Sequence, residues 1–297
     1  MKLLILGADG MIGHQHFLHF QEKFEVKAAL RQKAAVYRAF THLFNADNSY
    51  FEVDVRDMSR VKAVLDEFKP DLVIHAAGIV KQHPLSDDRL VSIEINALAP
   101  LRLAKLCQEV GARLITFSTD CIFSGKKGTY TEKDPADAQD VYGLTKALGE
   151  VHAKNALTLR TSTIGLELNP ANHHGLIEWF LNASGNIRGF RRAIYTGVIT
   201  KELCRVVEKI ICHYPALHGV YQLAAAPISK YDLLKTLAQK LQRRDIEVEP
   251  YDDFVCDRSL NGELLARTID YQAPDWDTML SELAYEIQAT RCSEEKR

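Results

Sequence analysis

Two side chains near the middle of the chain have the types and the spacing needed for acid–base chemistry. Tyr142 and Lys146 lie four residues apart in a stretch that the sequence predicts to be helical, so both side chains face the same side of that helix. A nearby ammonium group favours the ionised phenol and lowers a tyrosine pKa from its usual value of about 10. A tyrosine tuned in this way can act as a general acid or base. Because Tyr-x-x-x-Lys also arises by chance, the pair needs support from elsewhere in the chain.

The first support is a hydroxyl at the end of a predicted strand. Arg113–Ser118 is an apolar run that leads directly into Thr119, and in open α/β sheets ligands bind beyond the carboxyl ends of the strands. We expect Thr119 to donate a hydrogen bond to a carbonyl oxygen that Tyr142 protonates. Lys146 would then lower the pKa of Tyr142 and hold the ribose hydroxyls of a cofactor. The alternative is that the Thr119 hydroxyl only satisfies local backbone groups.

The second support is a glycine-rich turn that follows the first predicted strand, Lys2–Leu6. Gly7, Gly10 and Gly13 form the pattern G-x-x-G-x-x-G. Glycines let a phosphate approach the backbone and the positive end of the next helix. The spacing differs from the G-x-G-x-x-G fingerprint, so an ordinary strand-to-helix turn is the alternative. The expected dinucleotide contacts are these glycines and the residues between them, Asp9, Met11 and Ile12.

The end of the second predicted strand, Val26–Leu30, is basic. Arg31 and Lys33 follow it, where an acidic residue would bind the ribose 2′-hydroxyl of NAD and a basic one suits the 2′-phosphate of NADP. Arg31 therefore favours NADP(H), with NAD(H) or a merely solvated arginine as the alternatives. After the third predicted strand, Asp54 and Val55 are expected to border the adenine, although a surface carboxylate would explain Asp54 equally simply.

The elements that must position these residues follow from the hydrophobic pattern. Short apolar runs alternate with amphipathic stretches, which is typical of a parallel sheet covered by helices on both faces. We predict an α/β fold with a Rossmann-type doubly wound parallel sheet. The predicted strands are Lys2–Leu6, Val26–Leu30, Tyr50–Val53, Leu72–Ala76, Arg113–Ser118, Leu157–Thr161, Gly219–Ala224 and Ile246–Tyr251. The predicted helices include Ser59–Phe68, Ala99–Val110, Gly175–Leu181, Lys201–His213 and one that Ser229 caps and that runs through Leu241.

The second half of the chain is less regular and indicates a smaller region. We predict an NADP-binding domain over residues 1–165, to which 193–225 return. A substrate-binding α/β domain would comprise 166–192 and 226–297.

The bulk properties exclude several classes of protein. The 297 residues carry a formal net charge of −2, which argues against a nucleic-acid-binding surface or a membrane-attracted tail. The six cysteines form no close C-x-x-C pair, so neither a disulfide framework nor a structural metal site is expected. We therefore predict a cytoplasmic protein without nucleic-acid, membrane or metal partners. The oligomeric state stays open, with a homodimer as one alternative.

Together these motifs resemble the extended short-chain dehydrogenase/reductases. Within that family the chain is most similar to the dTDP-4-dehydrorhamnose reductases and their nucleotide-sugar relatives. The resemblance covers nearly the whole chain and is firmest before Ser162. It rests on Gly7–Gly13, His75–Gly78, Asn96, Ser118–Phe123, Val141–Lys146 and Leu159–Ser162.

The resemblance implies an oxidoreductase in which NADPH reduces the 4-keto group of a nucleotide-linked 6-deoxysugar, as in polysaccharide biosynthesis. It makes Thr119, Tyr142 and Lys146 the catalytic triad. It also implies that Asn96 supports the lysine through water, and that Thr161–Ile164 cross from the cofactor to the substrate. The loop along the cofactor would consist of Ala76, Ala77 and Gly78.

A nucleotide-sugar substrate carries a diphosphate, which needs cationic or amide partners. Arg191 and Arg192 are candidates for a bidentate phosphate contact, with a solvated basic pair as an equally good explanation. Lys81 is expected to face the mouth of the active site, although most lysines are simply exposed.

Two other activities compete with reduction. The related 4,6-dehydratases carry Asp-Glu after the catalytic threonine, and Cys121 stands in place of that glutamate, which argues against dehydration. GDP-fucose synthase, which the chain also resembles, has a cysteine there and a more distant histidine. Cys121 and His174 could therefore epimerise carbons beside the ketone, unless Cys121 is a small buried apolar residue. A non-catalytic, NADP-binding regulatory subunit is the remaining alternative.

Overall fold

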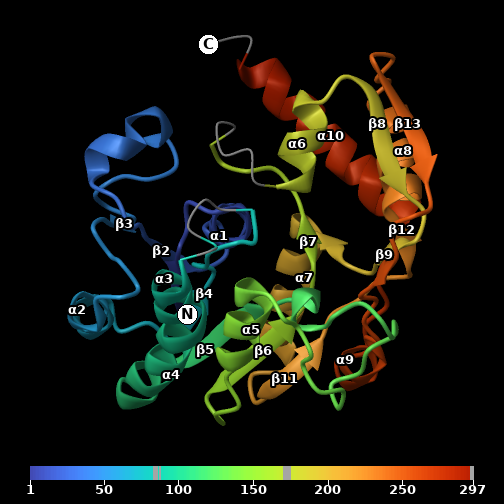
Figure 1. The fold of residues 1–297 in the computed structure, drawn as a ribbon. Coiled ribbons are helices and arrows are strands. Elements are labelled where there is room, and N and C mark those ends of the chain that lie inside the picture. The colour runs from blue at the N-terminus through green and yellow to red at the C-terminus, as the bar shows by residue number, and fades with distance from the viewer. Residues whose placement is uncertain (83–85, 87, 170–174, 295–297) are drawn as a thin grey trace.

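The computed structural model describes residues 1–82, 86, 88–169 and 175–294, with only the helical backbone described over 291–294. A seven-stranded, wholly parallel sheet forms the centre of the N-terminal part, in the order β11-β6-β5-β4-β1-β2-β3 (Figure 1). The strands are β1 Lys2–Leu6, β2 Glu25–Ala29, β3 Ser49–Tyr50, β4 Leu72–His75, β5 Arg113–Ser118, β6 Ala156–Arg160 and β11 Gly219–Gln222. The strand order reverses between β1 and β4, where ligands bind in doubly wound sheets. The predicted Rossmann-type fold is confirmed.

Helices cover both faces of this sheet because side chains alternate along each strand. Leu3 and Ile5 pack with α1 and α7, whereas Leu4 and Leu6 pack with α2 and α4. The helical segments of this part are α1 Met11–Phe20, η1 Ala34–Phe40, α2 Met58–Phe68, α3 Arg89–Ser92, η2 Ile93–Leu98, α4 Ala99–Glu109, η3 Asp120–Ile122, α5 Val141–Leu148 and α7 Thr200–His213.

Most of the remaining elements form a smaller region at the upper right of Figure 1, built on short strand pairs, whereas α9 (Glu263–Thr268) lies at the lower right beside β11. Strand β8 pairs in parallel with β13, while β9 pairs with β12 and β14, and β7 pairs with β10. These strands are β7 Thr163–Ile164, β8 Gly185–Phe190, β9 Ala193–Tyr195, β10 Val198–Ile199, β12 Ile228–Ser229, β13 Ile246–Tyr251 and β14 Cys256–Asp257. The helices are α6 Leu176–Asn182, α8 Lys230–Lys240, α9 Glu263–Thr268 and α10 Trp276–Glu294.

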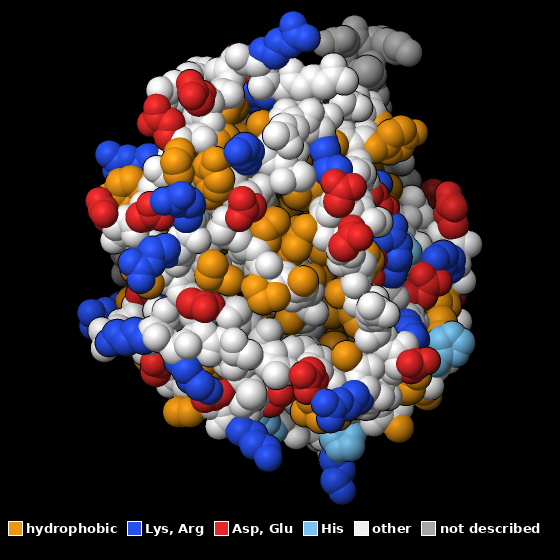
Figure 2. Space-filling model, turned by 90° about the vertical axis from the view of Figure 1, so that its right-hand side faces the viewer, with side chains coloured by type: hydrophobic (Ala, Val, Ile, Leu, Met, Phe, Trp, Pro, Cys, Tyr) orange, Lys and Arg blue, Asp and Glu red, His pale blue; other side chains and the backbone are white. Residues whose placement is uncertain are grey.

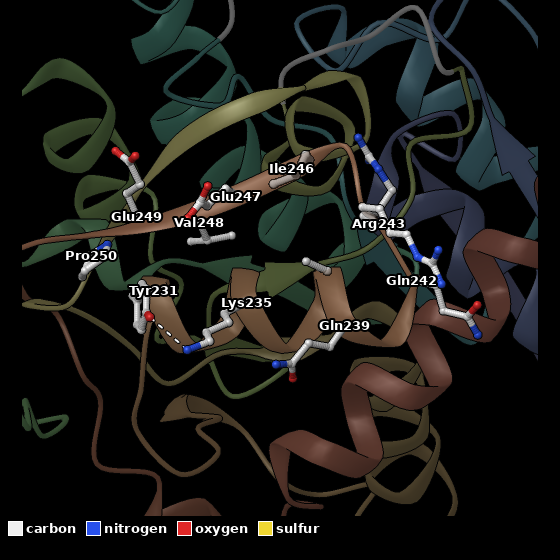
Figure 3. Close-up of a pocket in the computed structure, with 12 residues that line it drawn as sticks. Tyr231, Lys235, Gln239, Gln242, Arg243, Ile246, Glu247, Val248, Glu249 and Pro250 are labelled. Atoms are coloured by element: carbon white, nitrogen blue, oxygen red, sulfur yellow. Dashed lines mark hydrogen bonds between the residues drawn. The ribbon is translucent and has the colours of Figure 1, made fainter.

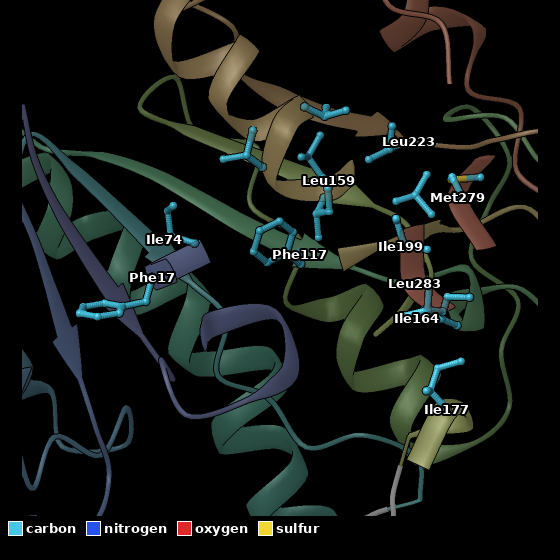
Figure 4. Close-up of a cluster of buried hydrophobic side chains, with 14 of the residues drawn as sticks. Phe17, Ile74, Phe117, Leu159, Ile164, Ile177, Ile199, Leu223, Met279 and Leu283 are labelled. Carbon is cyan, nitrogen blue, oxygen red and sulfur yellow. The ribbon is translucent and has the colours of Figure 1, made fainter. Parts of the chain in front are cut away.

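One hydrophobic cluster runs from the sheet into this smaller region (Figure 4). It contains Phe17 and Phe117 on the sheet side and Met279 and Leu283 of α10 on the other. The two parts of the chain are therefore joined by a shared hydrophobic core.

Most predicted elements are present, but the strands predicted over Tyr50–Val53 and Gly219–Ala224 end earlier than expected, the second of them at Gln222. The predicted strand Tyr50–Val53 ends at Tyr50, because Glu52 adopts a left-handed backbone conformation with φ of 57° that a strand cannot accommodate. The predicted cap of α8 is confirmed, since the Ser229 hydroxyl accepts a hydrogen bond from the Asp232 amide at 2.9 Å.

The surface in Figure 2 mixes charges of both signs around a central hollow in which hydrophobic side chains gather. On this face no broad area of one sign is visible, in keeping with the formal net charge of −2. Among the residues that the structure describes, no helix has the length and apolar character required to cross a membrane.

Candidate active site

A cavity of about 490 Å³ lies at the carboxyl ends of the central strands, where the sheet meets the smaller region. Segments that follow β1, β4, β5 and β6 supply one side of it, and α5 contributes Tyr142 and Lys146. From the sheet side the lining includes Met11, Ile12, His75–Gln82, Phe117–Cys121 and Thr161–Ile164. From the smaller region it includes Glu167, Gly175, Leu176, Ala193–Tyr195, Lys230, Phe254, Cys256 and Arg258.

The glycine-rich turn borders this cavity and requires glycine at two positions. Gly7 has a φ of +75°, and a Cβ there would lie 2.6 Å from the Ala77 amide nitrogen. A Cβ on Gly13 would collide with the Gly7 carbonyl oxygen. The turn therefore packs directly against the loop that follows β4. The α1 N-cap, Gly10, offers no side chain to its amides, so this helix end has the features of an anion site.

Asn96 holds that loop in place from inside a π-helical turn. Its side chain is buried, accepts from the Ile79 amide at 3.0 Å and donates to the Ile79 carbonyl at 3.1 Å. It also approaches the Thr145 hydroxyl at 3.4 Å, beside Lys146. Asn96 thus links the loop from β4 to α5 by direct hydrogen bonds.

The residues predicted at the adenosine end gather beyond β2 and β3. Arg31 is exposed. The Arg56 guanidinium holds the pKa of Asp54 below its usual value, and the charge of Arg31 adds to this effect. Asp54 pairs with Arg56 at 2.7 Å. Asp9 accepts a hydrogen bond from the Tyr37 hydroxyl at 2.7 Å. The described wall of the cavity does not include Arg31, Asp54, Val55 or Asp9. The residues predicted to bind the adenosine therefore lie outside the cavity that contains Tyr142 and Lys146.

Thr119, Tyr142 and Lys146 meet inside the cavity. Thr119 is buried, and its hydroxyl accepts from the Cys121 amide at 3.1 Å and contacts Asp120. The Thr119 hydroxyl lowers the pKa of Tyr142 and so offsets part of the effect of burial on that phenol. The Lys146 ammonium donates to the Phe117 carbonyl at 2.6 Å. The three groups therefore surround one space above the end of β5.

The prediction that Lys146 lowers the pKa of Tyr142 is wrong. Burial, reinforced by Cys121, holds the pKa of Tyr142 well above its usual value. Burial also lowers the pKa of Lys146 to about 8, with the Glu150 charge opposing part of that shift. The Lys146 ammonium is bound to the Phe117 carbonyl, and loss of solvent is the largest cause of the pKa shift at both Tyr142 and Lys146. Tyr142 is accordingly a protonated phenol at neutral pH, the form that a proton donor requires.

Cys121 also lies at this end of the cavity, beside Arg258. The Arg258 Nη1 atom approaches the Cys121 sulfur at 3.7 Å. Burial raises the pKa of the Cys121 thiol to about 12, so the group is a thiol and not a thiolate at neutral pH. His174, the second residue of the epimerase alternative, lies outside the described residues.

The predicted phosphate-binding cations occupy different places. Lys81 lines the cavity and pairs with Asp140, the N-cap of α5, at 2.9 Å. Arg191 is bound to Asp252 through its Nε at 2.8 Å on the surface, and neither it nor Arg192 is among the described residues of the cavity wall.

Lys230 and Arg258 do line the cavity, and no sequence motif marks them. They belong to α8 and to the segment after β14, which long-range pairing with β9 brings to the site. The sequence signal nearest to them is the N-cap at Ser229, which fixes the start of α8 directly before Lys230.

A second groove, of about 630 Å³, lies between α8 and β13 (Figure 3). Long polar side chains line it, among them Tyr231 and Lys235, which are hydrogen-bonded at 3.0 Å. It lies away from the strand ends that carry Thr119 and the glycine turn. The described residues contain no group of three or more His, Cys, Asp or Glu suited to a metal ion.

The chain is similar in sequence to several known proteins. The chain is 26% identical to the spore coat polysaccharide biosynthesis protein SpsK of Bacillus subtilis (strain 168), over 74% of this chain and 72% of that one. It is 26% identical to dTDP-4-dehydrorhamnose reductase of Aggregatibacter actinomycetemcomitans, over 78% and 76% respectively. It is also 24% identical to methionine adenosyltransferase 2 subunit beta of Rattus norvegicus, over 85% and 75%.

Solved structures share the fold over almost the full length. The dTDP-4-dehydrorhamnose reductase of Clostridium acetobutylicum superposes with a TM-score of 0.78 at 23% identity, covering 97% of this chain and 100% of that one. The enzyme of that name from Bacillus anthracis, solved in complex with NADP, gives 0.75 at 21% identity, covering 96% and 99%. The model of the RmlD substrate binding domain family matches residues 1–288, and the chain belongs to this family.

Proposed function

We propose that this protein is an NADPH-dependent oxidoreductase that reduces a keto group of a nucleotide-linked sugar. The observation that carries the proposal is the meeting of Thr119, Tyr142 and Lys146 in one cavity beside the glycine-rich turn. A bound nicotinamide cofactor would supply the hydride. Thr119 would hold the carbonyl oxygen, and the protonated Tyr142 would deliver the proton. Lys146 would hold the ribose hydroxyls of the cofactor.

The residues of the turn suit a dinucleotide. Gly7 and Gly13 have no room for a side chain, and the first amides of α1 have no cap from Gly10. The exposed Arg31 at the end of β2 suits a 2′-phosphate, and one structural neighbour was solved with NADP. We therefore propose NADP(H) as the preferred cofactor, with NAD(H) as the alternative.

The finer proposal concerns the substrate, a 4-keto-6-deoxysugar linked to a nucleoside diphosphate. It rests on the relative named dTDP-4-dehydrorhamnose reductase and on Lys230 and Arg258, two cations of the cavity wall. Guanidinium and ammonium groups suit a diphosphate. We propose these two residues, in place of Arg191 and Arg192, as its partners.

The direct test follows NADPH consumption with 4-keto-6-deoxysugars linked to dTDP, UDP or GDP and identifies the product by mass spectrometry. We expect turnover with at least one of them and a gain of two hydrogens in the sugar. Tight NADPH binding without turnover on any of them would contradict a reductase.

That negative result would favour the second candidate, a subunit of another enzyme. It has a specific motivation, because one relative is named as subunit beta of methionine adenosyltransferase 2. Epimerisation has weaker support, since the buried Cys121 thiol holds its proton. Turnover in deuterated water separates it from simple reduction, because epimerisation would place deuterium at C3 or C5 of the sugar.

A further inference from the structure

The loop of residues 124–130, which follows η3, folds around the hydroxyl group of its last residue, Tyr130. That oxygen accepts hydrogen bonds from the amides of Gly125 and Lys127, both at 3.1 Å. The Tyr130 ring is buried and stacks on Phe123, with the two ring centroids 4.1 Å apart. Gly125 has a φ of +84°, which a glycine adopts without strain. The side chain of Tyr130 therefore fixes the shape of this loop.

The same loop is hydrogen-bonded to the segment that carries Arg258. The Gly125 carbonyl accepts from the Asp257 amide at 2.8 Å. The Tyr130 amide donates to the Ser259 carbonyl, also at 2.8 Å. The two neighbours of Arg258 in the chain are thus both attached to the loop, one through each of its ends.

The side chain of Arg258 is held by this part of the chain as well. Its Nε atom donates to the carbonyl of Phe123, directly before the loop, at 2.8 Å. Its Nη1 atom approaches the Cys121 sulfur at 3.7 Å. A Cβ on Gly125 would lie 3.2 Å from the Arg258 Cγ atom, so the loop backbone packs against the arginine stem. Arg258 therefore borders the cavity with its orientation already restricted.

A restricted arginine is better suited to a phosphate than a mobile one. A mobile arginine side chain loses rotamer freedom when it binds, and this loss weakens the affinity. The planar guanidinium also needs a defined orientation for a bidentate contact with phosphate oxygens. Groups that restrict Arg258 in the free protein can therefore increase the affinity for a diphosphate without touching it.

We propose that Tyr130 is a positioning residue for the diphosphate of the sugar nucleotide, because it shapes the loop that orients Arg258. Tyr130 is not among the described residues of the cavity wall, so it acts through Arg258 and not by contact with the substrate. The inference rests on the diphosphate contact of the proposed function. It does not depend on the identity of the base or of the sugar.

Isothermal titration calorimetry with dTDP, UDP and GDP in turn tests this role without turnover, and the tightest of the three serves as the probe. Tyr130→Phe keeps the stacked ring and removes the oxygen that accepts from two amides. We expect it to raise the Kd of the probe about tenfold, the effect of one well-placed hydrogen bond. The Kd of NADPH should not change. Tyr271→Phe loses a hydroxyl that donates to Glu202 at 2.9 Å away from the cavity, and this control should bind the probe as the wild type does.

A double-mutant cycle separates positioning from general destabilisation. Arg258→Ala should raise the Kd of the probe about 10- to 150-fold, because a charge-assisted contact is lost. If Tyr130 acts through Arg258, the double variant should bind within about twofold of Arg258→Ala alone. An effect of Tyr130→Phe that persists undiminished without Arg258 would overturn the inference.

Ser259→Ala provides a second variant in case Tyr130→Phe does not fold. The Ser259 hydroxyl accepts from the Thr129 amide at 2.7 Å, so its loss also loosens the loop and should weaken binding of the probe only while Arg258 is present. Wild-type affinity in both Tyr130→Phe and Ser259→Ala would overturn the inference and leave the reductase proposal intact. If the wild type binds none of the three nucleotides, or if Arg258→Ala binds as the wild type does, the diphosphate contact fails and the inference with it.

Discussion

Lys146 sets the expected pH dependence at the scale of single residues. Burial lowers its pKa to about 8, and the neighbouring His75 stays neutral because burial lowers its pKa to about 3. Below pH 8 the ammonium is present and can hold the ribose hydroxyls, whereas above pH 8 its charge is lost. We expect kcat/KM for keto-sugar reduction to fall as pH rises through about 8. Lys146→Arg, if active, should move the fall to higher pH, and a flat profile to pH 10 would contradict this role.

Arg31 determines the expected choice between the two dinucleotides. Loss of a charge-assisted contact to the 2′-phosphate costs about 1.5–3 kcal/mol, or about 10- to 150-fold in affinity. Arg31→Ala should raise the KM for NADPH by that factor and leave the KM for NADH nearly unchanged. Arg102→Ala, an exposed arginine on α4, serves as the control. An equal loss for both cofactors would show that Arg31 does not bind the phosphate.

Some site residues could be predicted from the sequence and others could not, for a physical reason. Thr119 and Tyr142 follow short local motifs whose geometry is fixed within one strand or one helical turn. Arg258 and Glu167 reach the cavity only through contacts between distant segments, such as the pairing of β14 with β9. The direction of the Tyr142 pKa shift could not be predicted, because burial cannot be inferred from a spacing of four residues.

At the scale of elements, a buried ion pair joins the segment directly after α5 to the sheet below the site. Glu150 accepts from Arg160 of β6 at 2.7 and 2.8 Å and from the Ser118 hydroxyl of β5 at 2.7 Å. Both charged side chains are at most 8% exposed. Removal of one partner would leave the other buried and unpaired.

Glu150→Gln should therefore lower the free energy of unfolding by about 3–5 kcal/mol in urea denaturation. The double variant Glu150→Gln with Arg160→Met should recover most of that loss, because both charges are then gone. The exposed pair of Glu263 and Arg267 provides a control, and Glu263→Gln should change little. Equal effects of the buried and the exposed substitution would refute this account.

The accuracy with which elements could be predicted depended on their length. The long apolar strands and the helices that cover them carry a clear hydrophobic period, so β1, β5 and α4 lie close to their predicted positions. Strands of two or three residues, such as β10 and β14, carry no such period. The smaller region consists largely of such strands, so its architecture could not be predicted in detail.

At the scale of the whole molecule, the shared hydrophobic cluster predicts cooperative unfolding. Leu283 of α10 is fully buried in the cluster that also contains Leu3 of β1. Leu283→Ala should cost about 2–5 kcal/mol and should shift the unfolding of both regions together. Circular dichroism and NADPH binding, followed against urea, should give one coincident transition. Leu264→Ala, at a half-exposed leucine of α9, is the control. Two separate transitions would show that the regions unfold independently.

The most direct test of the central claim is turnover by Tyr142→Phe. The substitution removes only the hydroxyl that is proposed to deliver the proton, and it leaves the ring in place. Loss of a positioned general acid typically costs about 10²–10⁴-fold. We predict a fall of that size in kcat for NADPH-dependent reduction of the keto-sugar nucleotide, with NADPH binding retained. Tyr285→Phe, at a tyrosine of α10 that is 72% exposed, should match the wild type. Unchanged turnover in Tyr142→Phe would contradict the account.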